Sequence, residues 1–142
     1  KTSQPPVGKF VEVFQEAAKD AAGLLCVTLT GAHSGGYASA MAAKALLPDI
    51  PIEVVDSRGV SMGTGFLALA AARAGLKGQS LGDVVKLAES IRTRMHHFIA
   101  IAGAGICDIE SNCDRYFPIF LFRCHIQISI LKSSVCQTEA KR

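Results

Sequence analysis

The sequence predicts an α/β domain with a mainly parallel sheet and flanking helices. Short apolar runs alternate with segments whose apolar residues recur at helical spacing, which is the order that parallel sheets require. A loop rich in Gly and Ser follows each of the first two apolar runs, so polar groups gather where these strands end. The chain has 142 residues, of which 49% are hydrophobic, and this is enough apolar material for one domain with a core.

The first part of the chain is expected to form one helix and one buried strand. Lys1–Gly8 contains two prolines and is expected to be an extended loop. Phe10 and Phe14 then recur at helical spacing, and Gly23 ends this helix. The apolar run Leu24–Leu29 is typical of a strand that is buried on both faces.

The remaining elements continue the alternation of helices and strands. Ser80 is the expected N-cap of one of these helices, because Asp83 follows three residues later as in a capping box. The expected order is helix, strand, helix, helix and strand, over Tyr37–Leu47, Ile52–Val55, Phe66–Ala74, Ser80–Arg94 and His97–Ala102.

Thr30–Gly36 and Asp56–Gly65 are the two loops that follow the first two strands. Because parallel sheets bind ligands beyond the carboxyl ends of their strands, these loops are the expected ligand site. Both are rich in hydroxyl groups and glycines, which present O–H and backbone N–H donors. Donors of this kind favour an anionic ligand.

One hypothesis for this edge of the sheet is a serine hydrolase of the esterase or lipase type. Ala32–Gly36 (AHSGG) lies between a strand and a helix and resembles G-x-S-x-G with Ala in the first position, which would make Ser34 the nucleophile. Asp56 would be its acid, and His97 or His125 its base. The alternative is a loop whose hydroxyl and amides bind a ligand or cap a helix, and no oxyanion-loop motif precedes the serine.

Other chemistries lack their signatures. The phosphate-binding patterns G-x-x-x-x-G-K-[ST] and G-x-G-x-x-G are absent, so no nucleotide cofactor is expected. The cysteine spacings match no zinc pattern, so no metal is expected either. A dispersed net charge of +3 argues against nucleic acid, and no run reaches the ~18 apolar residues of a membrane span.

The composition of the chain changes near Gly103. Residues 103–142 contain four of the five cysteines, and no glycine follows Gly105. We therefore divide the chain into an α/β domain over residues 1–102 and an unmatched tail over residues 103–142. Such a tail is typical of a shifted reading frame or an incorrectly predicted gene end.

Four stretches of residues 1–102 together resemble the DegV family of bacterial fatty-acid-binding proteins. They are Thr2–Pro5 (TSQP), Leu29–Ala40 (LTGAHSGGYASA), Ile52–Gly63 (IEVVDSRGVSMG) and the helix-rich stretch Phe66–Arg94. Each motif is short, but their order and spacing together are specific.

The resemblance implies a carrier without catalysis of its own. Such a protein buries a long-chain fatty acid between or within two α/β domains and presents its carboxylate to a fatty-acid kinase in the cytoplasm. By resemblance, the hydroxyls of Thr2 or Ser3 and of Ser34 hold the carboxylate, with Gly35 in the same loop. This suits a carboxylate, which only accepts hydrogen bonds. The family also has an additional strand upstream and a second domain downstream. The resemblance therefore implies an N-terminally truncated, incomplete domain with impaired binding.

Overall fold

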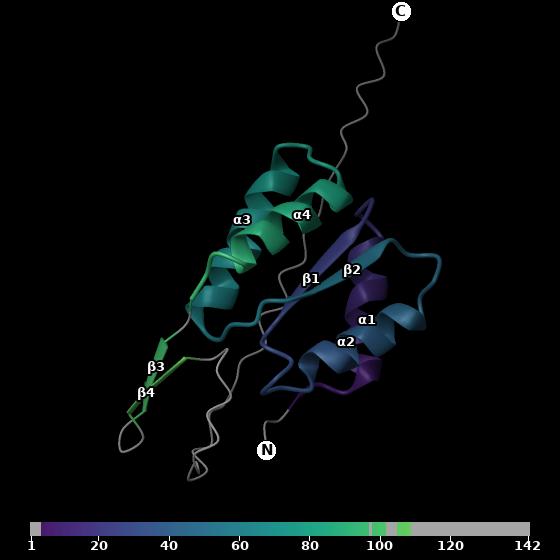
Figure 1. The fold of residues 1–142 in the computed structure, drawn as a ribbon. Coiled ribbons are helices and arrows are strands. Elements are labelled where there is room, and N and C mark those ends of the chain that lie inside the picture. The colour runs from purple at the N-terminus through teal and green to yellow at the C-terminus, as the bar shows by residue number, and fades with distance from the viewer. Residues whose placement is uncertain (1–3, 97, 102–104, 109–142) are drawn as a thin grey trace, which may run out of the picture.

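The computed structural model describes residues 4–96, 98–101 and 105–108, which form helices on both sides of a small parallel sheet (Figure 1). This arrangement confirms the predicted α/β class. The elements are, in chain order, α1 (Val7–Ala18), β1 (Leu24–Thr28), α2 (Gly36–Ala45), β2 (Ile52–Asp56), α3 (Met62–Leu76), α4 (Leu81–Arg92), β3 (Phe98–Ile101) and β4 (Gly105–Asp108).

The parallel pair β1–β2 is the centre of the fold. Its register places Leu24 opposite Ile52 and Thr28 opposite Asp56, so the two strands end at the same level. All five residues of β1 are buried, as expected for a parallel strand that is covered on both faces. The loops that follow the two strands therefore leave the sheet side by side.

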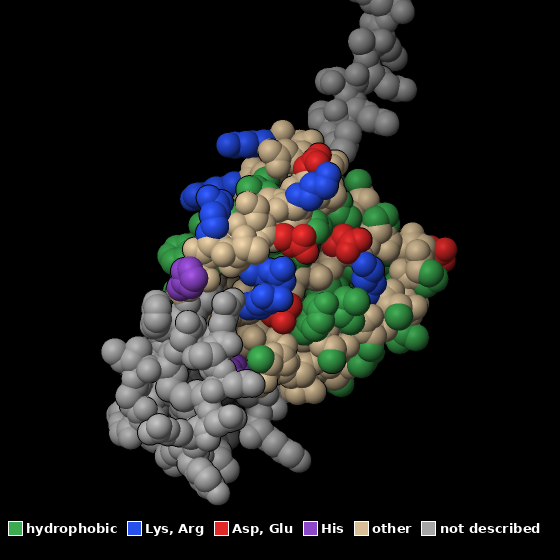
Figure 2. Space-filling model, viewed as in Figure 1, with side chains coloured by type: hydrophobic (Ala, Val, Ile, Leu, Met, Phe, Trp, Pro, Cys, Tyr) green, Lys and Arg blue, Asp and Glu red, His purple; other side chains and the backbone are tan. Residues whose placement is uncertain are grey.

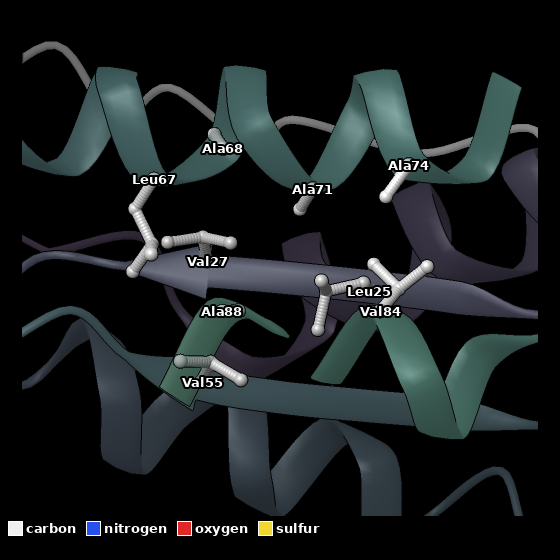
Figure 3. Close-up of a cluster of buried hydrophobic side chains, with 9 residues drawn as sticks. All are labelled: Leu25, Val27, Val55, Leu67, Ala68, Ala71, Ala74, Val84 and Ala88. Carbon is white, nitrogen blue, oxygen red and sulfur yellow. The ribbon is translucent and has the colours of Figure 1, made fainter. Parts of the chain in front are cut away.

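Alternating side chains of β1 divide the core between the two faces of the sheet. Leu25 and Val27 point toward α3 and α4, where they meet Leu67 and Val84 (Figure 3). Leu24 and Cys26 belong to a second cluster on the opposite face, together with apolar residues of α1 and α2. This period of two is the geometry of an extended strand, and it lets one short strand support two helical layers.

The helix α3 is longer than the sequence predicted. It begins at Met62 and not at Phe66, so the second loop ends at Ser61. Gly63 and Gly65 suggested a loop, but Thr64 between them is buried and fixes this first turn on the sheet side. Tertiary packing thus overrides the weak helix propensity of glycine.

The helix α4 starts as predicted, because Ser80 caps it. The Ser80 hydroxyl accepts from the backbone N–H of Asp83 at 3.2 Å and donates to the Asp83 carboxylate at 2.7 Å. Local sequence chemistry therefore determines this helix start.

The last predicted strand does not extend the parallel sheet. Residues 98–101 form β3, which pairs antiparallel with β4 in a separate two-stranded sheet. This pairing crosses the predicted domain boundary at residues 102 and 103. Among the described residues, no helix is long and apolar enough to cross a membrane.

Charged side chains are mixed over the surface. On the face seen in Figure 2, Lys and Arg side chains lie beside Asp and Glu side chains and do not form a patch of one sign. One such pair joins α2 to β2, where Lys44 Nζ lies 2.9 Å from Glu53 Oε2. Opposite charges are therefore paired locally at this point of the surface.

Leu67 tests the core between α3 and the sheet, because its side chain is fully buried while Leu76 of the same helix is 81% exposed. Leu67→Ala is expected to lower the free energy of unfolding by about 2–5 kcal/mol, since it removes buried methyl groups and leaves a cavity. Leu76→Ala should change it by less than about 0.5 kcal/mol. Urea unfolding followed by circular dichroism measures both, and equal effects would contradict this description of the core.

Burial raises the pKa of the Cys26 thiol to about 12. The unfolded chain loses this proton at lower pH, so the stabilising contribution of the thiol is complete below about pH 9 and is lost as the pH rises toward 12. A variant that keeps Cys26 as its single cysteine is expected to react slowly with a thiol-specific disulfide reagent at pH 8 and rapidly in urea. Rapid reaction of the folded protein would contradict the buried position.

Candidate functional site

The candidate site lies where the loops after β1 and β2 meet. The first loop (residues 29–35) and the second loop (residues 57–61) leave the carboxyl ends of the paired strands. The backbone N–H of Thr30 donates to the carbonyl of Gly59 at 3.0 Å, which joins the two loops directly. Thr30 is buried, so this contact lies beneath the loop surface. The two loops that the sequence places after the first two strands therefore lie together, and their role as the ligand site stays a prediction.

Asp56, the last residue of β2, binds both loops through one carboxylate. Its Oδ2 accepts from the backbone N–H of Gly31 at 3.1 Å, and its Oδ1 accepts from the backbone N–H of Arg58 at 2.9 Å. Its backbone carbonyl also accepts from Arg92 Nη1 at 3.4 Å, which links α4 to the same point. The acid of the hydrolase hypothesis is therefore engaged with backbone amides.

The Ser34 hydroxyl oxygen already accepts one hydrogen bond from the backbone. The backbone N–H of Gly36 donates to Ser34 Oγ at 3.3 Å, in the local pattern that serine often makes two residues ahead of an amide. The backbone N–H of Ser34 donates to the carbonyl of Thr30 at 3.1 Å. Within the described residues, no acceptor takes the hydroxyl proton of Ser34, so this group can donate to a ligand.

Gly35 lies against the N-terminal segment. A Cβ added at Gly35 would overlap the side-chain amide of Gln4. Thr2 and Ser3 lie outside the described residues, but Gln4 belongs to the same TSQP motif and directly follows Ser3 in the sequence. The structure thus brings the end of this motif to the first loop, next to Ser34.

Two buried hydroxyls support the second loop from inside. Ser57 Oγ lies 2.8 Å from Thr64 Oγ1 and accepts from the backbone N–H of Gly59 at 3.2 Å. Both side chains are more than nine-tenths buried. These hydroxyls join the second loop to the first turn of α3, so their visible role is structural.

Ser61 is a feature that the sequence analysis did not find. It has φ 54° and ψ −133°, an unusual backbone conformation for a residue other than glycine, and its side chain does not cap α3. Such a conformation costs about 1–3 kcal/mol. The available signal was Gly59–Gly63 (GVSMG), which matches G-x-S-x-G fully, whereas AHSGG matches it only in part.

The parts of the hydrolase hypothesis are not assembled in the described residues. Ser34 lies in the first loop and Asp56 ends β2, but Asp56 binds two amides, and His97 and His125 lie outside the described residues. The described residues contain no group of three or more His, Cys, Asp or Glu side chains that could hold a metal ion. What the geometry offers to a ligand is the Ser34 hydroxyl and the start of α2, at the end of a parallel sheet.

Together, the helices on both sides of a parallel sheet and the two joined loops define an α/β fold with polar loops at the carboxyl end of its sheet. The family model described as "Uncharacterised protein, DegV family" matches residues 1–103. The chain belongs to the DegV family. The predicted boundary at residue 102 is close to the end of this match, but the division into a domain and an unmatched tail stays a prediction.

Curated relatives share this part of the chain. A DegV domain-containing protein of Staphylococcus aureus (strain COL) is 30% identical over 101 residues, which are 71% of this chain and 36% of the relative. A DegV domain-containing protein of Clostridium acetobutylicum is 35% identical over 105 residues, with the same shares. The chain thus spans about a third of the length of these relatives.

Solved structures have the same fold. One is a DegV family protein from Thermus thermophilus that is described by its fatty acid binding. It matches with a TM-score of 0.63 and 34% sequence identity, and the match covers 68% of this chain and 34% of the Thermus chain. A stearic acid-binding protein from Eubacterium ventriosum matches with a TM-score of 0.56 and 28% sequence identity. This match covers 61% of this chain and 31% of the Eubacterium chain.

Gly35→Ala is expected to separate the first loop from Gln4. Because φ at Gly35 is −72°, alanine fits the backbone, and only the flexible Gln4 side chain must move. The free energy of unfolding should therefore change by less than about 1 kcal/mol. The side-chain amide signals of Gln4 in a ¹⁵N NMR spectrum should shift.

Gly8→Ala is the matched control, because nothing lies within 4 Å of a Cβ at Gly8. It should leave the Gln4 amide signals unchanged. Unchanged Gln4 signals in Gly35→Ala as well would show that the two residues are not in contact in solution.

Proposed function

We propose that this chain contributes the carboxylate-binding part of a fatty-acid-binding protein. The observation that carries the proposal is the Ser34 hydroxyl, whose oxygen accepts from Gly36 and whose proton remains available. A carboxylate accepts hydrogen bonds and donates none, so it complements this group. Two solved proteins that share the fold, at 34% and 28% sequence identity, are described by fatty-acid and stearic-acid binding.

The surroundings of Ser34 favour an anion further. Ser34 lies just before α2, and the N-terminus of a helix carries unpaired N–H groups and a partial positive charge. Gly35 leaves this end of α2 open to close approach, apart from the Gln4 amide. We propose that Thr2 or Ser3, which precede Gln4, provide the second hydroxyl.

The acyl chain would supply most of the binding free energy. Each buried methylene contributes roughly 0.8 kcal/mol, which gives on the order of 10 kcal/mol for a long chain before the costs of binding. The carboxylate contacts therefore select for the acid and fix its orientation. We propose that the remaining enclosure of the acyl chain comes from regions of the DegV fold outside the matched 103 residues.

The proposed role of the bound acid is presentation to a kinase. The first loop is exposed at Gly31 and His33 and half-buried at Ser34, so a carboxylate held there lies near the surface. A separate fatty-acid kinase in the cytoplasm would then phosphorylate the carboxylate, and this chain would provide no catalytic group.

Ser34→Ala is expected to weaken the binding of a fatty acid about ten- to a hundredfold. A hydrogen bond to a charged group contributes roughly 1.5–3 kcal/mol, and each 1.4 kcal/mol is about tenfold in affinity. The measurement is displacement of a fluorescent fatty acid by palmitate and by methyl palmitate. Palmitate should lose more affinity than the methyl ester, because the neutral ester carbonyl accepts a weaker hydrogen bond than a carboxylate does. Ser90→Ala, at an exposed position of α4, is the control and should change neither the palmitate affinity nor the methyl palmitate affinity.

The same variants test the hydrolase alternative. Hydrolysis of a p-nitrophenyl ester by the unmodified chain that disappears in Ser34→Ala, with palmitate affinity unchanged, would overturn the carrier proposal. Ser61→Ala belongs in this assay, because the full G-x-S-x-G match and the unusual backbone angles occur at Ser61. Ser34→Ala also removes the acceptor of the Gly36 N–H, so its stability is measured separately.

A further inference from the structure

We propose that Asp56 is a positioning residue for carboxylate recognition, acting through the first loop to hold the Ser34 hydroxyl in place. This inference rests on the proposed function and adds a residue that does not itself contact the ligand. Asp56 ends β2, and its two carboxylate oxygens bind one backbone amide in each loop. One side chain thereby fixes both loops relative to the sheet.

The path from Asp56 to Ser34 runs through consecutive backbone contacts. Asp56 Oδ2 accepts from the N–H of Gly31, while the neighbouring Thr30 carbonyl accepts from the N–H groups of His33 and Ser34 at 3.2 and 3.1 Å. Residues 30–34 therefore form one closed turn. A displacement of its Gly31 end is transmitted to Ser34 because the same turn contains both residues.

The close approach of Gly31 to Asp56 shows how little space this contact leaves. A Cβ at Gly31 would lie 3.1 Å from Asp56 Oδ2 and 3.5 Å from Cβ of Tyr37. The first distance is tighter than an ordinary contact, so the Asp56 carboxylate would have to shift by a few tenths of an ångström, whereas the second is an ordinary contact. Gly31→Ala therefore disturbs the same contact from the loop side while keeping the Asp56 charge.

The contacts of Asp56 also restrict where an anion can bind. The N–H groups of Gly31 and Arg58 are already bound to its oxygens, so a ligand carboxylate is left with the Ser34 hydroxyl and the start of α2. The Arg92 guanidinium donates to the backbone carbonyl of Asp56 at 3.4 Å and so keeps a positive charge near the end of β2. A positive charge at this end of the sheet favours an anionic ligand.

A double-mutant cycle tests the proposal directly. Asp56→Asn keeps one acceptor oxygen but cannot accept from both amides, and it is expected to lower palmitate affinity about tenfold. In a Ser34→Ala background the same change should cost less than about twofold, because the residue it positions is absent. Affinity for methyl palmitate should fall less than affinity for palmitate in every variant, because the ester carbonyl is a weaker acceptor. Asp49→Asn, at an exposed site outside both loops, is the matched control.

Hydrogen exchange gives a readout that needs no ligand. In Asp56→Asn and in Gly31→Ala, the amides of Gly31, Ser34 and Gly36 should exchange more than about tenfold faster, while amides in the middle of α4 keep their rates. Global destabilisation would instead accelerate α4 as well. Loss of Gly31 protection alone would overturn the proposal, because Ser34 would then hold its place without Asp56.

The outcomes separate the two proposals. If Ser34→Ala leaves palmitate affinity unchanged, the proposed function fails, and hydrogen exchange still decides whether Asp56 positions Ser34. If Ser34→Ala weakens binding but Asp56→Asn costs the same in both backgrounds, or weakens the methyl ester equally, the proposed function stands and the role of Asp56 is overturned.

Discussion

The parallel pairing of β1 and β2 is the constraint on which the rest of the structure depends. Its register sets Thr28 opposite Asp56, so both strands end at one level and their loops emerge side by side. A shift of one residue would reverse the faces of β1 and separate its side chains from both helical layers. The same register brings the Asp56 carboxylate within hydrogen-bond distance of the Gly31 N–H, so the sheet determines the geometry of the site.

The chemistry of the site follows from which hydrogen-bonding groups are already used. The Ser57 hydroxyl of the second loop and the Thr64 hydroxyl of α3 bind one another inside the protein, and they hold the loop against the helix. In the first loop, Ser34 accepts from its own chain and retains a proton. A hydroxyl of this kind suits recognition of an acceptor such as a carboxylate, whereas a nucleophile needs a base that accepts its proton.

The described helices and strands correspond to one part of the DegV relatives. The chain spans about a third of its curated relatives, and the two loops provide polar contacts rather than an apolar enclosure. Large apolar side chains on α3 remain exposed, including Met62 and Phe66 directly after the second loop. In the proposed function, head-group recognition and acyl burial are therefore separate physical problems, and the described residues are proposed to serve the first.

The sequence by itself determined the elements whose signals are local. The buried run of β1, the Ser80 cap of α4 and the serine-containing first loop are all readable from neighbouring residues, because caps and strand periodicity act over a few positions. Only the tertiary structure decided that Gln4 meets Gly35, that Asp56 binds Gly31, and that β3 pairs with β4. The first two contacts join residues 25 or more positions apart, and packing and register select them, so no local pattern encodes either. The third joins strands that only three residues separate, and the division of the chain at residue 102 placed its two strands in different parts.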